Sequence, residues 1–310
     1  MKLGLFMPER VKPFDKMSAS LWIRALQIVP HYQAMGISVC INHFFKQYDV
    51  AILYREYTFK TLIKLFYLKL IAKKVFYDQV VNVFIHHNNV SAMQVWVARI
   101  IAKNIDGCIC STTPIQQSAK LLTNYTTVIP ECISLSHFKY KKATINYTAP
   151  TFIWSGICKK AKALSPYSDV IDANIILITN QPIELSFNYE YIKWSHQTFP
   201  QDILRGDIAF LPRDTSTVYN QGHSEFKALV FANASMPIIA NKLPSYQELS
   251  KYYESIVFLE DYNNDVYQCV QALIKKSRDT TQIRQLYSSH SFAHQVHQFV
   301  CNENLGNNTE

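Results

Sequence analysis

The segment SEFKALVFANASMPIIANKLPSYQEL (224–249) combines a polar start with an apolar helical run, and Lys227 stands where that helix is predicted to begin. The free N–H groups and the positive dipole end of a helix disfavour a lysine there but favour a bound phosphate. We therefore predict that Lys227 binds phosphate, whereas the alternative is an exposed lysine with no ligand. Ser224, just before the predicted helix, is expected either to cap it or to contact the phosphate as well.

A second group of cations follows a glycine turn. Gly156 ends the predicted strand 150–156, and Lys159, Lys160 and Lys162 come soon after it. Open parallel sheets bind ligands at the carboxyl ends of their strands, so one of these lysines is expected to make a second phosphate contact. A solvated run of charges is the equally weighted alternative. The chain has no Asp-x-Asp motif, so no metal site is predicted, and cations with backbone dipoles are left to stabilise negative charge.

Two histidines and an aspartate lie at predicted strand ends in the N-terminal half. His86 and His87 follow the apolar run that starts at residue 81, and Asp78 closes the run 73–78. Histidine titrates near neutral pH and can transfer a proton or bond a substrate hydroxyl. The alternatives are that the histidines bond only a loop carbonyl and that Asp78 caps a turn.

Two arginines are candidates for holding an anionic acceptor. Arg24 lies on the first predicted helix, and Arg55 directly follows the predicted strand 50–54. Their neighbours Trp22 and Tyr54 are interpreted as packing residues.

The segment TFKTLIKLFYLKLIAKK (58–74) mixes lysines with apolar residues all round. A basic amphipathic helix of this kind can lie on an anionic membrane. The favoured alternative is a helix that covers a sheet and extends its lysines into solvent. The lysines concerned are Lys60, Lys64, Lys69, Lys73 and Lys74.

Composition indicates a globular protein of about two domains. The 310 residues are 48% hydrophobic and 17% charged, which excludes a disordered chain. Seven cysteines lack any C-x-x-C pairing, so neither a zinc site nor a disulfide framework is predicted, and a reducing, cytoplasmic compartment is expected. The net charge of +8 comes without a nucleic-acid-binding signature, so an anionic lipid or a phosphorylated substrate is expected as partner, and no nucleic acid. Neither a secretory signal nor a membrane span is expected, because the apolar runs are short.

Short apolar runs alternate with helix-period segments along most of the chain, which is typical of parallel sheets built from βαβ units. The polar, basic segment 137–150 interrupts this alternation and is interpreted as a linker. A helix after residue 286, with Phe292, Val296 and Phe299 on one face, is expected to cross back to the first domain. The predicted strands cover residues 2–7, 36–42, 50–54, 73–78, 81–86, 107–111, 126–130, 150–156, 174–180, 191–195, 207–212, 237–241 and 255–261. The predicted domains cover residues 1–145 and 146–285, with the final helix and a tail at 286–310.

The order of several motifs resembles GT-B glycosyltransferases, in particular family 4-like enzymes of bacterial surface-polysaccharide assembly. FIWSG before the lysines, DIAFLPRD, and the segment from Ser224 to Leu249 are similar to the nucleotide-binding lobe of that group. MSASLWIRALQIVPHYQAMG, KKVFYDQVVNVF and TTVIPECISLSHF look like its N-terminal motifs and its entry to the linker. The resemblance implies an α/β fold of two doubly wound Rossmann-like lobes, whose parallel sheets face a cleft.

The same resemblance implies a retaining, metal-independent transfer of a sugar from a nucleotide-sugar donor, with no cofactor. The acceptor would be a bacterial glycan or a lipid-linked oligosaccharide (capsule, O-antigen or lipooligosaccharide), reached in the cytoplasm or by peripheral contact with an anionic membrane at its inner face. Glu225, beside Ser224, joins the donor-side candidates. The chain departs from the family where Val230 replaces a ribose-binding Glu and Ser235 replaces a Gly. A sugar-nucleotide epimerase and a non-catalytic glycan- or partner-binding subunit therefore stay open as alternatives.

Overall fold

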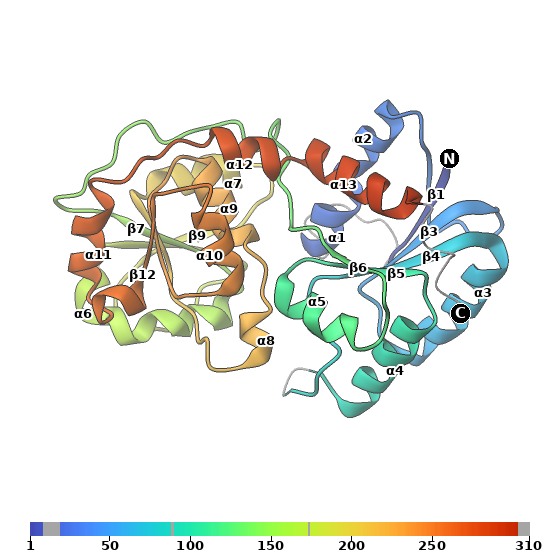
Figure 1. Cartoon of the computed structure of the whole chain (residues 1–310). Helices are drawn as coiled ribbons and strands as arrows, with labels where there is room; N and C mark the ends of the chain where they lie inside the picture. The colour runs from blue at the N-terminus through green and yellow to red at the C-terminus, as the bar shows by residue number, and fades with distance from the viewer. Residues whose placement is uncertain (9–18, 88–89, 173, 303–310) are drawn as a thin grey trace. The chain divides into compact units, whose positions relative to one another are not determined.

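The computed structural model describes residues 1–8, 19–87, 90–172 and 174–302. The chain divides into two compact units, and each is described by itself (Figure 1). Unit 1 contains the described residues of Met1–Cys132 together with Gln221–Ser224 and the C-terminal helix α13 (Ser289–Cys301). Unit 2 contains those of Ile133–Asn220 and Glu225–Ser288.

Unit 1 is built on a six-stranded parallel sheet in the order β2-β1-β3-β4-β5-β6. The chain runs outward from β1 in one direction to β2 and then in the other direction from β3, which is a doubly wound topology. The strands are β1 (Lys2–Phe6), β2 (Ser38–Ile41), β3 (Tyr48–Tyr54), β4 (Ala72–Gln79), β5 (Gly107–Cys110) and β6 (Thr126–Val128).

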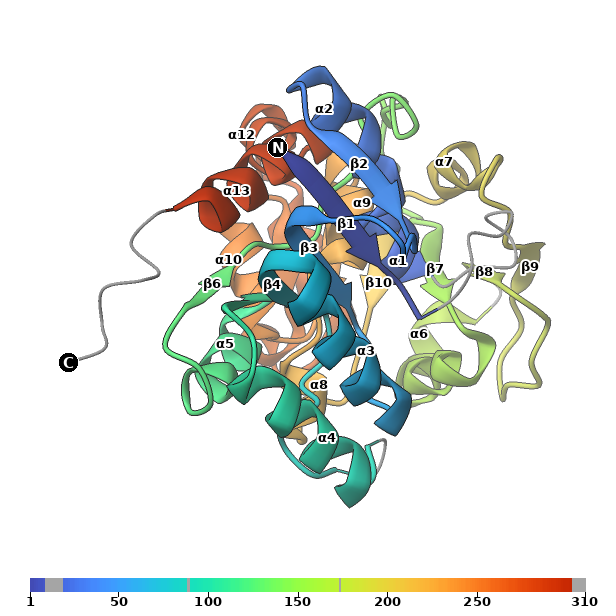
Figure 2. The same cartoon turned by 90° about the vertical axis from the view of Figure 1, so that its right-hand side faces the viewer.

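Helices cover both faces of this sheet. One hydrophobic core lies under α3 (Phe59–Ile71), α4 (Ala92–Lys103) and α5 (Thr113–Lys120) (Figure 2). The other lies under α1 (Ala19–Arg24), the 3-10 turn η2 (Leu26–Ile28), α2 (Val29–Ala34) and α13. The helical pattern of residues 20–34, which Pro30 is predicted to kink or to end early, forms these three short pieces before β2. Pro30 stands in the first turn of α2, where its missing N–H has no helical partner to lose.

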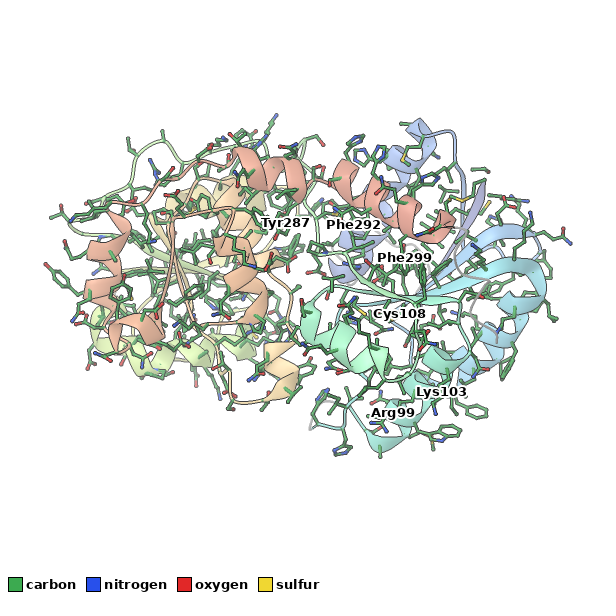
Figure 3. The ribbon with its side chains drawn as sticks, in the orientation of Figure 1. Arg99, Lys103, Cys108, Tyr287, Phe292 and Phe299 are labelled. Carbon is green, nitrogen blue, oxygen red and sulfur yellow. The ribbon has the colours of Figure 1, made fainter. Side chains whose placement is uncertain are left out.

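The helix α13 packs on unit 1 through one apolar face. Phe292 and Val296 are buried in the same core as Leu21 and Ile28. The ring of Phe299 stacks on Tyr125 with centroids 4.3 Å apart. Figure 3 shows Phe292 and Phe299 along this helix. The last part of the chain thus completes the core of the N-terminal sheet.

Unit 2 contains a second six-stranded parallel sheet, in the order β12-β11-β10-β7-β8-β9. Its strands are β7 (Phe152–Gly156), β8 (Ile175–Thr179), β9 (Glu190–Lys193), β10 (Ile208–Leu211), β11 (Ile238–Ala240) and β12 (Ile256–Phe258). The connecting helices are η3 (Cys158–Tyr167), α6 (Ser168–Ile171), α7 (Phe199–Asp202), η4 (Ile203–Arg205), α8 (Val218–Gln221), α9 (Phe226–Asn233), α10 (Pro244–Ser250), η5 (Leu259–Tyr262), α11 (Val266–Leu273) and α12 (Thr281–Leu286). The two sheets confirm the predicted α/β class with two doubly wound lobes.

The strand predicted over residues 81–86 is wrong. This segment forms bends between β4 and α4, and only an isolated bridge joins His87 to Val90. Val83 and Phe84 are nevertheless fully buried in the core under α3 and α4. An apolar run of this length marks burial, and its period alone does not distinguish a strand from a buried loop.

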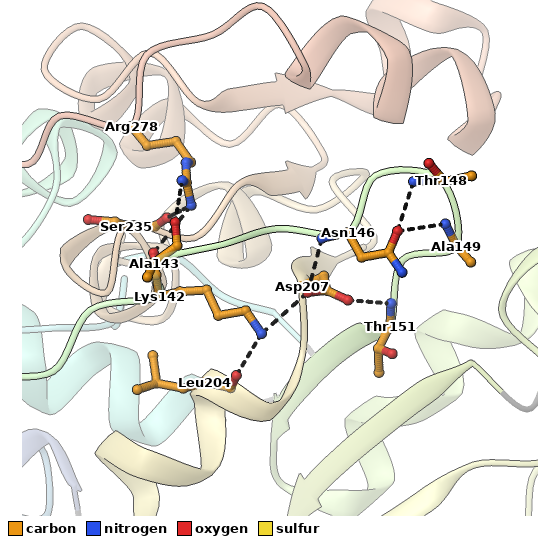
Figure 4. Close-up of polar contacts among 10 residues, drawn as sticks. All are labelled: Lys142, Ala143, Asn146, Thr148, Ala149, Thr151, Leu204, Asp207, Ser235 and Arg278. Carbon is orange, nitrogen blue, oxygen red and sulfur yellow. Dashed lines mark hydrogen bonds and ion pairs between the residues drawn. The ribbon is translucent and has the colours of Figure 1, made fainter.

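The segment predicted as a linker has no regular structure and is fastened to unit 2 (Figure 4). Lys142 donates to the Leu204 carbonyl at 2.9 Å, and its Nζ lies 3.3 Å from Oδ1 of Asp207. Arg278 donates to the carbonyls of Lys142, Ala143 and Ser235. The carbonyls of Lys142 and Ala143 are therefore paired with a side chain of unit 2, as buried or irregular backbone requires.

Candidate anion-binding site

Lys227 lies in the first turn of α9 and against an aromatic ring. Its Nζ lies 4.2 Å from the centroid of the Trp154 ring, on β7. An ammonium group over an indole face is a favourable cation–π contact. Lys227 is half-buried, which differs from the alternative of an exposed lysine.

Gly156 leaves the space that Lys227 occupies. It ends β7 with a φ of +154°, a conformation that residues with a side chain rarely adopt. A Cβ at this position would lie 2.8 Å from the Trp154 ring and 2.9 Å from the Lys227 Nζ. Only glycine therefore lets the strand end, the indole and the ammonium group meet.

The surroundings of Lys227 are cationic. Burial lowers the pKa of Lys227 well below its ordinary value, and the charges of Arg213 and Lys160 lower it further. No carboxylate is among the groups that act on this pKa, and among the described residues Lys227 makes no ion pair with an acidic group. An ammonium group that has no acidic partner and feels the charges of two further cations favours an anionic ligand, because such a ligand would stabilise the charged form of the lysine.

These cations lie near the point where the strand order of unit 2 reverses. β7 pairs in parallel with both β8 and β10, so the chain leaves β7 toward one edge of the sheet and returns toward the other. Gly156 ends β7, and Arg213 stands two residues after β10. The carboxyl ends of such diverging strands are where open α/β sheets bind ligands.

Arg213 was missed by the sequence reasoning. Its backbone N–H donates to Oδ1 of Asn241 at 2.7 Å, which anchors the turn after β10 beside β11. The available signal was its position directly after the run that forms β10.

Of the three lysines after Gly156, only Lys160 acts on the pKa of Lys227. Lys159, Lys160 and Lys162 all lie on η3 and are exposed at their side chains. The expectation that one of them joins the phosphate site is therefore best directed at Lys160, although its contact with a ligand stays a prediction.

Ser224 and Glu225 lie at the point where the chain passes from unit 1 to unit 2. The Ser224 hydroxyl donates to Oε2 of Glu131, within unit 1. Glu225 is buried and occupies the N-cap position of α9, where its side chain makes no capping hydrogen bond. Ser224 is thus not the N-cap, and the donor-side roles of both residues remain predictions.

In unit 1, the structure joins Arg24 and Asp78 as a buried ion pair. Nε of Arg24 lies 2.7 Å from Oδ1 of Asp78, and each side chain is 1% exposed. Arg24 also donates to the Ile129 carbonyl at 3.0 Å and lies over the Phe292 ring, 4.8 Å from its centroid. Burial raises the pKa of the Asp78 carboxyl, and Arg24 acts in the opposite direction. The pair holds α1, the end of β4 and α13 together.

Several buried polar atoms, in this pair and at the ends of β4 and β5, have no hydrogen-bond partner within the described part of the chain. They are Nη2 of Arg24, Oδ2 of Asp78, both amide atoms of Gln79 and Oγ of Ser111. Gln79 ends β4, and Ser111 directly follows β5, the neighbouring strand. Buried polar groups are normally paired, so this cluster at a carboxyl edge is a second candidate for ligand contact.

The other predicted residues of unit 1 lie in less specific surroundings. His87 Nε2 lies 3.2 Å from the Asn82 carbonyl oxygen, as in the loop-carbonyl alternative, and burial lowers the pKa of this imidazole. His86 is exposed. Arg55 has a positive φ of 43°, and its backbone N–H donates to the Asp78 carbonyl. Catalytic roles for the histidines and an acceptor role for Arg55 stay predictions.

The described residues contain neither a metal-binding cluster nor a membrane-spanning helix. Over residues 1–8, 19–87, 90–172 and 174–302, no group of three or more His, Cys, Asp or Glu side chains is arranged to hold a metal ion. Within the same described part of the chain, no helix has the length and apolar character needed to cross a membrane.

Solved structures of similar fold span almost the whole chain at low sequence identity. Sucrose-phosphate synthase from Thermosynechococcus elongatus is 11% identical, with a TM-score of 0.68 over 96% of this chain and 97% of that one. Alr3699/HepE from Anabaena, solved in complex with UDP and glucose, is 13% identical, with a TM-score of 0.62 over 95% of this chain and 98% of that one. UDP-GlcNAc 2-epimerase from Methanocaldococcus jannaschii is 10% identical, with a TM-score of 0.56 over 97% and 99% of the two chains.

No protein-family model matches the chain, and no curated protein matches it in sequence. The likeness to the solved structures therefore concerns the fold. Two six-stranded parallel sheets with flanking helices, matched along nearly the full length of such proteins, give this chain the GT-B fold of two Rossmann-like lobes.

Proposed function

We propose that this chain is a glycosyltransferase that takes a sugar from a nucleotide-sugar donor, and that unit 2 binds the donor diphosphate. The observation that carries the proposal is Lys227, a partly buried ammonium group without an acidic partner, beside Arg213 and Lys160. Its position near the strand-order reversal of the second sheet is the ligand position of this class of fold.

Sugar transfer breaks the bond between the anomeric carbon and the diphosphate oxygen, and negative charge grows on that oxygen. Lys227 and Arg213 would stabilise this charge, and the N-terminal N–H groups of α9 would add to their effect. The positive charges of Lys227, Arg213 and Lys160 repel one another when no ligand is bound. An anionic ligand would relieve this repulsion and would therefore be stabilised more than by a single solvated lysine. The proposed mechanism is retaining and metal-independent, with the leaving phosphate receiving the proton of the acceptor hydroxyl.

The proposed acceptor side lies in unit 1, at the carboxyl ends of β4 and β5. Oδ2 of Asp78 and Oγ of Ser111 would bond acceptor hydroxyls, since both lack partners in the described residues. Arg24 is proposed to keep Asp78 ionised and oriented rather than to bind the acceptor directly. The acceptor itself is proposed to be a bacterial glycan or a lipid-linked oligosaccharide.

Two alternatives have support of their own. The fold likeness to the 2-epimerase supports an epimerase, although the groups that act on the pKa of Lys227 are the cations Arg213 and Lys160. Val230 is buried within α9, in the place where the resembled family has a ribose-binding Glu, and this supports a non-catalytic subunit. Ser235 keeps a glycine-like backbone with φ of 58°, so that replacement leaves the local turn intact.

The test uses a panel of nucleotide sugars and separates the three functions. Donors are first screened by thermal shift, since a ligand at a hundred times its dissociation constant stabilises by about 2.7 kcal/mol. Donor consumption is then measured with and without added glycan acceptor. Consumption that requires acceptor supports the transferase, interconversion of sugars without acceptor supports the epimerase, and binding without turnover supports the non-catalytic subunit.

Chelation tests the metal-independent part of the proposal. EDTA should leave donor consumption unchanged, because the proposed charge stabilisation comes from Lys227, Arg213 and the helix α9. Full loss of activity that Mg²⁺ or Mn²⁺ restores would reject it.

A further inference from the structure

The outer side of α3 is apolar as well as its inner side. Phe59, Ile63, Phe66 and Leu70 are between 56% and 81% exposed. They are spaced by four, three and four residues, so they form one stripe along the helix. Leu62, Leu65 and Leu68 form the opposite, buried stripe in the core of unit 1. An amphipathic helix that only covered the sheet would have a polar outer face.

The neighbouring helix extends this apolar stripe. α4 packs beside α3 on the same face of the sheet, as Figures 1 and 2 show. Its Met93 and Trp96 are both more than half exposed. Phe45 is 98% exposed, and its neighbour Phe44 is held to α3 because the Tyr67 hydroxyl donates to the Phe44 carbonyl at 2.6 Å. We define the α3–α4 surface as Phe45 with the exposed residues of these two helices.

The charges of the α3–α4 surface are of one sign. The helices span Phe59–Ile71 and Ala92–Lys103 and contain no Asp or Glu. Lys64 is neutralised by Glu56, which precedes α3. The remaining cations of the two helices are exposed, and Figure 3 shows two of them on α4. They are Lys60, Lys69, Arg99 and Lys103.

We propose that the α3–α4 surface binds an anionic phospholipid bilayer. Exposed Phe and Trp side chains partition into the interface between headgroups and acyl chains, and lysines around them pair with lipid phosphates. Exposure of a contiguous apolar stripe to water is unfavourable, so the stripe is expected to contact an apolar partner. Because the exposed charges around it are positive, that partner must also be anionic. An anionic bilayer satisfies both conditions across two whole helices. The favoured alternative was a helix that covers the sheet and extends its lysines into solvent. Lys60 and Lys69 are exposed in this way, and apolar residues of α3 are exposed as well.

This surface lies within unit 1 and is independent of the proposed donor site in unit 2. The binding can therefore be measured without any enzymatic activity. Diphosphate binding, measured on the same samples, reports separately on the proposed function.

The experiment is sedimentation of the full chain with vesicles of phosphatidylcholine containing about one third phosphatidylglycerol, compared with pure phosphatidylcholine. Binding should be selective for the anionic vesicles and should weaken as salt rises. Lys60→Gln with Lys103→Gln should lower the partition coefficient about twenty-fivefold, from about fivefold per lysine. Phe66→Gln with Leu70→Gln should lower it at least about tenfold.

The matched control is Tyr267→Gln, which removes an aromatic side chain that is 69% exposed on α11 of unit 2. It should leave vesicle binding unchanged, and all variants should keep the thermal stability of the parent chain. The proposal would be overturned if the parent chain did not bind anionic vesicles. It would also be overturned if both double variants bound them as strongly as the parent chain does. The parent chain could instead self-associate without binding vesicles, and the double variant of Phe66 and Leu70 could abolish that association. This result would also overturn the proposal and would assign the surface to a second copy of the chain.

Discussion

Arg24 in unit 1 and Lys227 in unit 2 are both withdrawn from solvent, but only one of them has a counter-ion. Arg24 bonds Asp78 and the Ile129 carbonyl, so its charge is neutralised inside the protein. Lys227 lies against Trp154 and beside two further cations. The Arg24–Asp78 ion pair stabilises the fold as long as both partners are present. The group of cations around Lys227 is unfavourable unless an anion is bound. The contrast distinguishes a structural charge from one prepared for a ligand.

The largest expected effect is on the neutralised pair. Arg24→Met should lower the free energy of unfolding by about 3–5 kcal/mol, because it leaves the Asp78 carboxylate buried without its partner. Chemical denaturation of the full chain measures this. Adding Asp78→Leu should recover most of the loss, since no isolated charge then remains.

The exposed pair of Lys73 and Asp49, also in unit 1, provides the control. Lys73→Met should cost no more than about 1 kcal/mol, since a solvated ion pair contributes little. If Arg24→Met cost no more than this control, the Arg24 pair would not be structural.

The next largest effect is expected at Gly156, which leaves the space that the Lys227 ammonium group occupies. Gly156→Ala places a Cβ 2.9 Å from the Lys227 Nζ and strains the backbone, so it should weaken nucleoside diphosphate binding about tenfold. Calorimetric titration measures the affinity. Gly36→Ala is the matched control, because Gly36 also has a positive φ, of 74°, but a Cβ there meets nothing within 4 Å. Equal affinities in the two variants would contradict the role assigned to Gly156.

A smaller effect is a dependence of stability on pH. His137 and His196, both in unit 2, stack with ring centroids 4.0 Å apart. Burial and then the charge of His137 lower the pKa of His196 to about 4. The unfolded chain, with an ordinary histidine pKa of about 6.5, binds more protons in this range, so stability present above pH 6.5 should fall as the pH drops toward 4.

The expected loss is about 1 kcal/mol, because both rings are partly solvated. Thermal melts at stepwise pH measure it, and His196→Asn should reduce the slope. The control His43→Asn removes an exposed histidine and should leave the slope of stability against pH unchanged. His31 and His87 in unit 1 also have lowered pKa values, so part of the slope should remain in the His196 variant.

The sequence was sufficient for features that depend on neighbouring residues. The apolar runs that form β3 and β7, and the placement of Lys227 at the start of α9, follow from local patterning. Pro30 locates a break in the first helical segment for the same reason. These features needed no knowledge of the tertiary structure.

Features that depend on distant residues were not predictable. Arg24 and Asp78 are 54 positions apart and meet only because β4 lies beneath α1 in the folded unit. Arg213 acts on Lys227 only because β10 pairs with β7 in the sheet. The residues next to Arg24 and Arg213 in the sequence do not indicate these contacts. Arg24 was therefore expected to hold an acceptor, and Arg213 was missed.

The most direct test of the central claim is a nucleoside diphosphate titration of the parent chain and of Lys227→Met, paired with the stability of both chains without ligand. Methionine keeps a long side chain against Trp154 and removes the charge. The account predicts that affinity falls about ten- to hundredfold, from the loss of one charge-assisted contact, while stability without ligand stays equal or rises. A variant that binds diphosphate as tightly as the parent chain but unfolds more easily would contradict the claim and make Lys227 a structural residue.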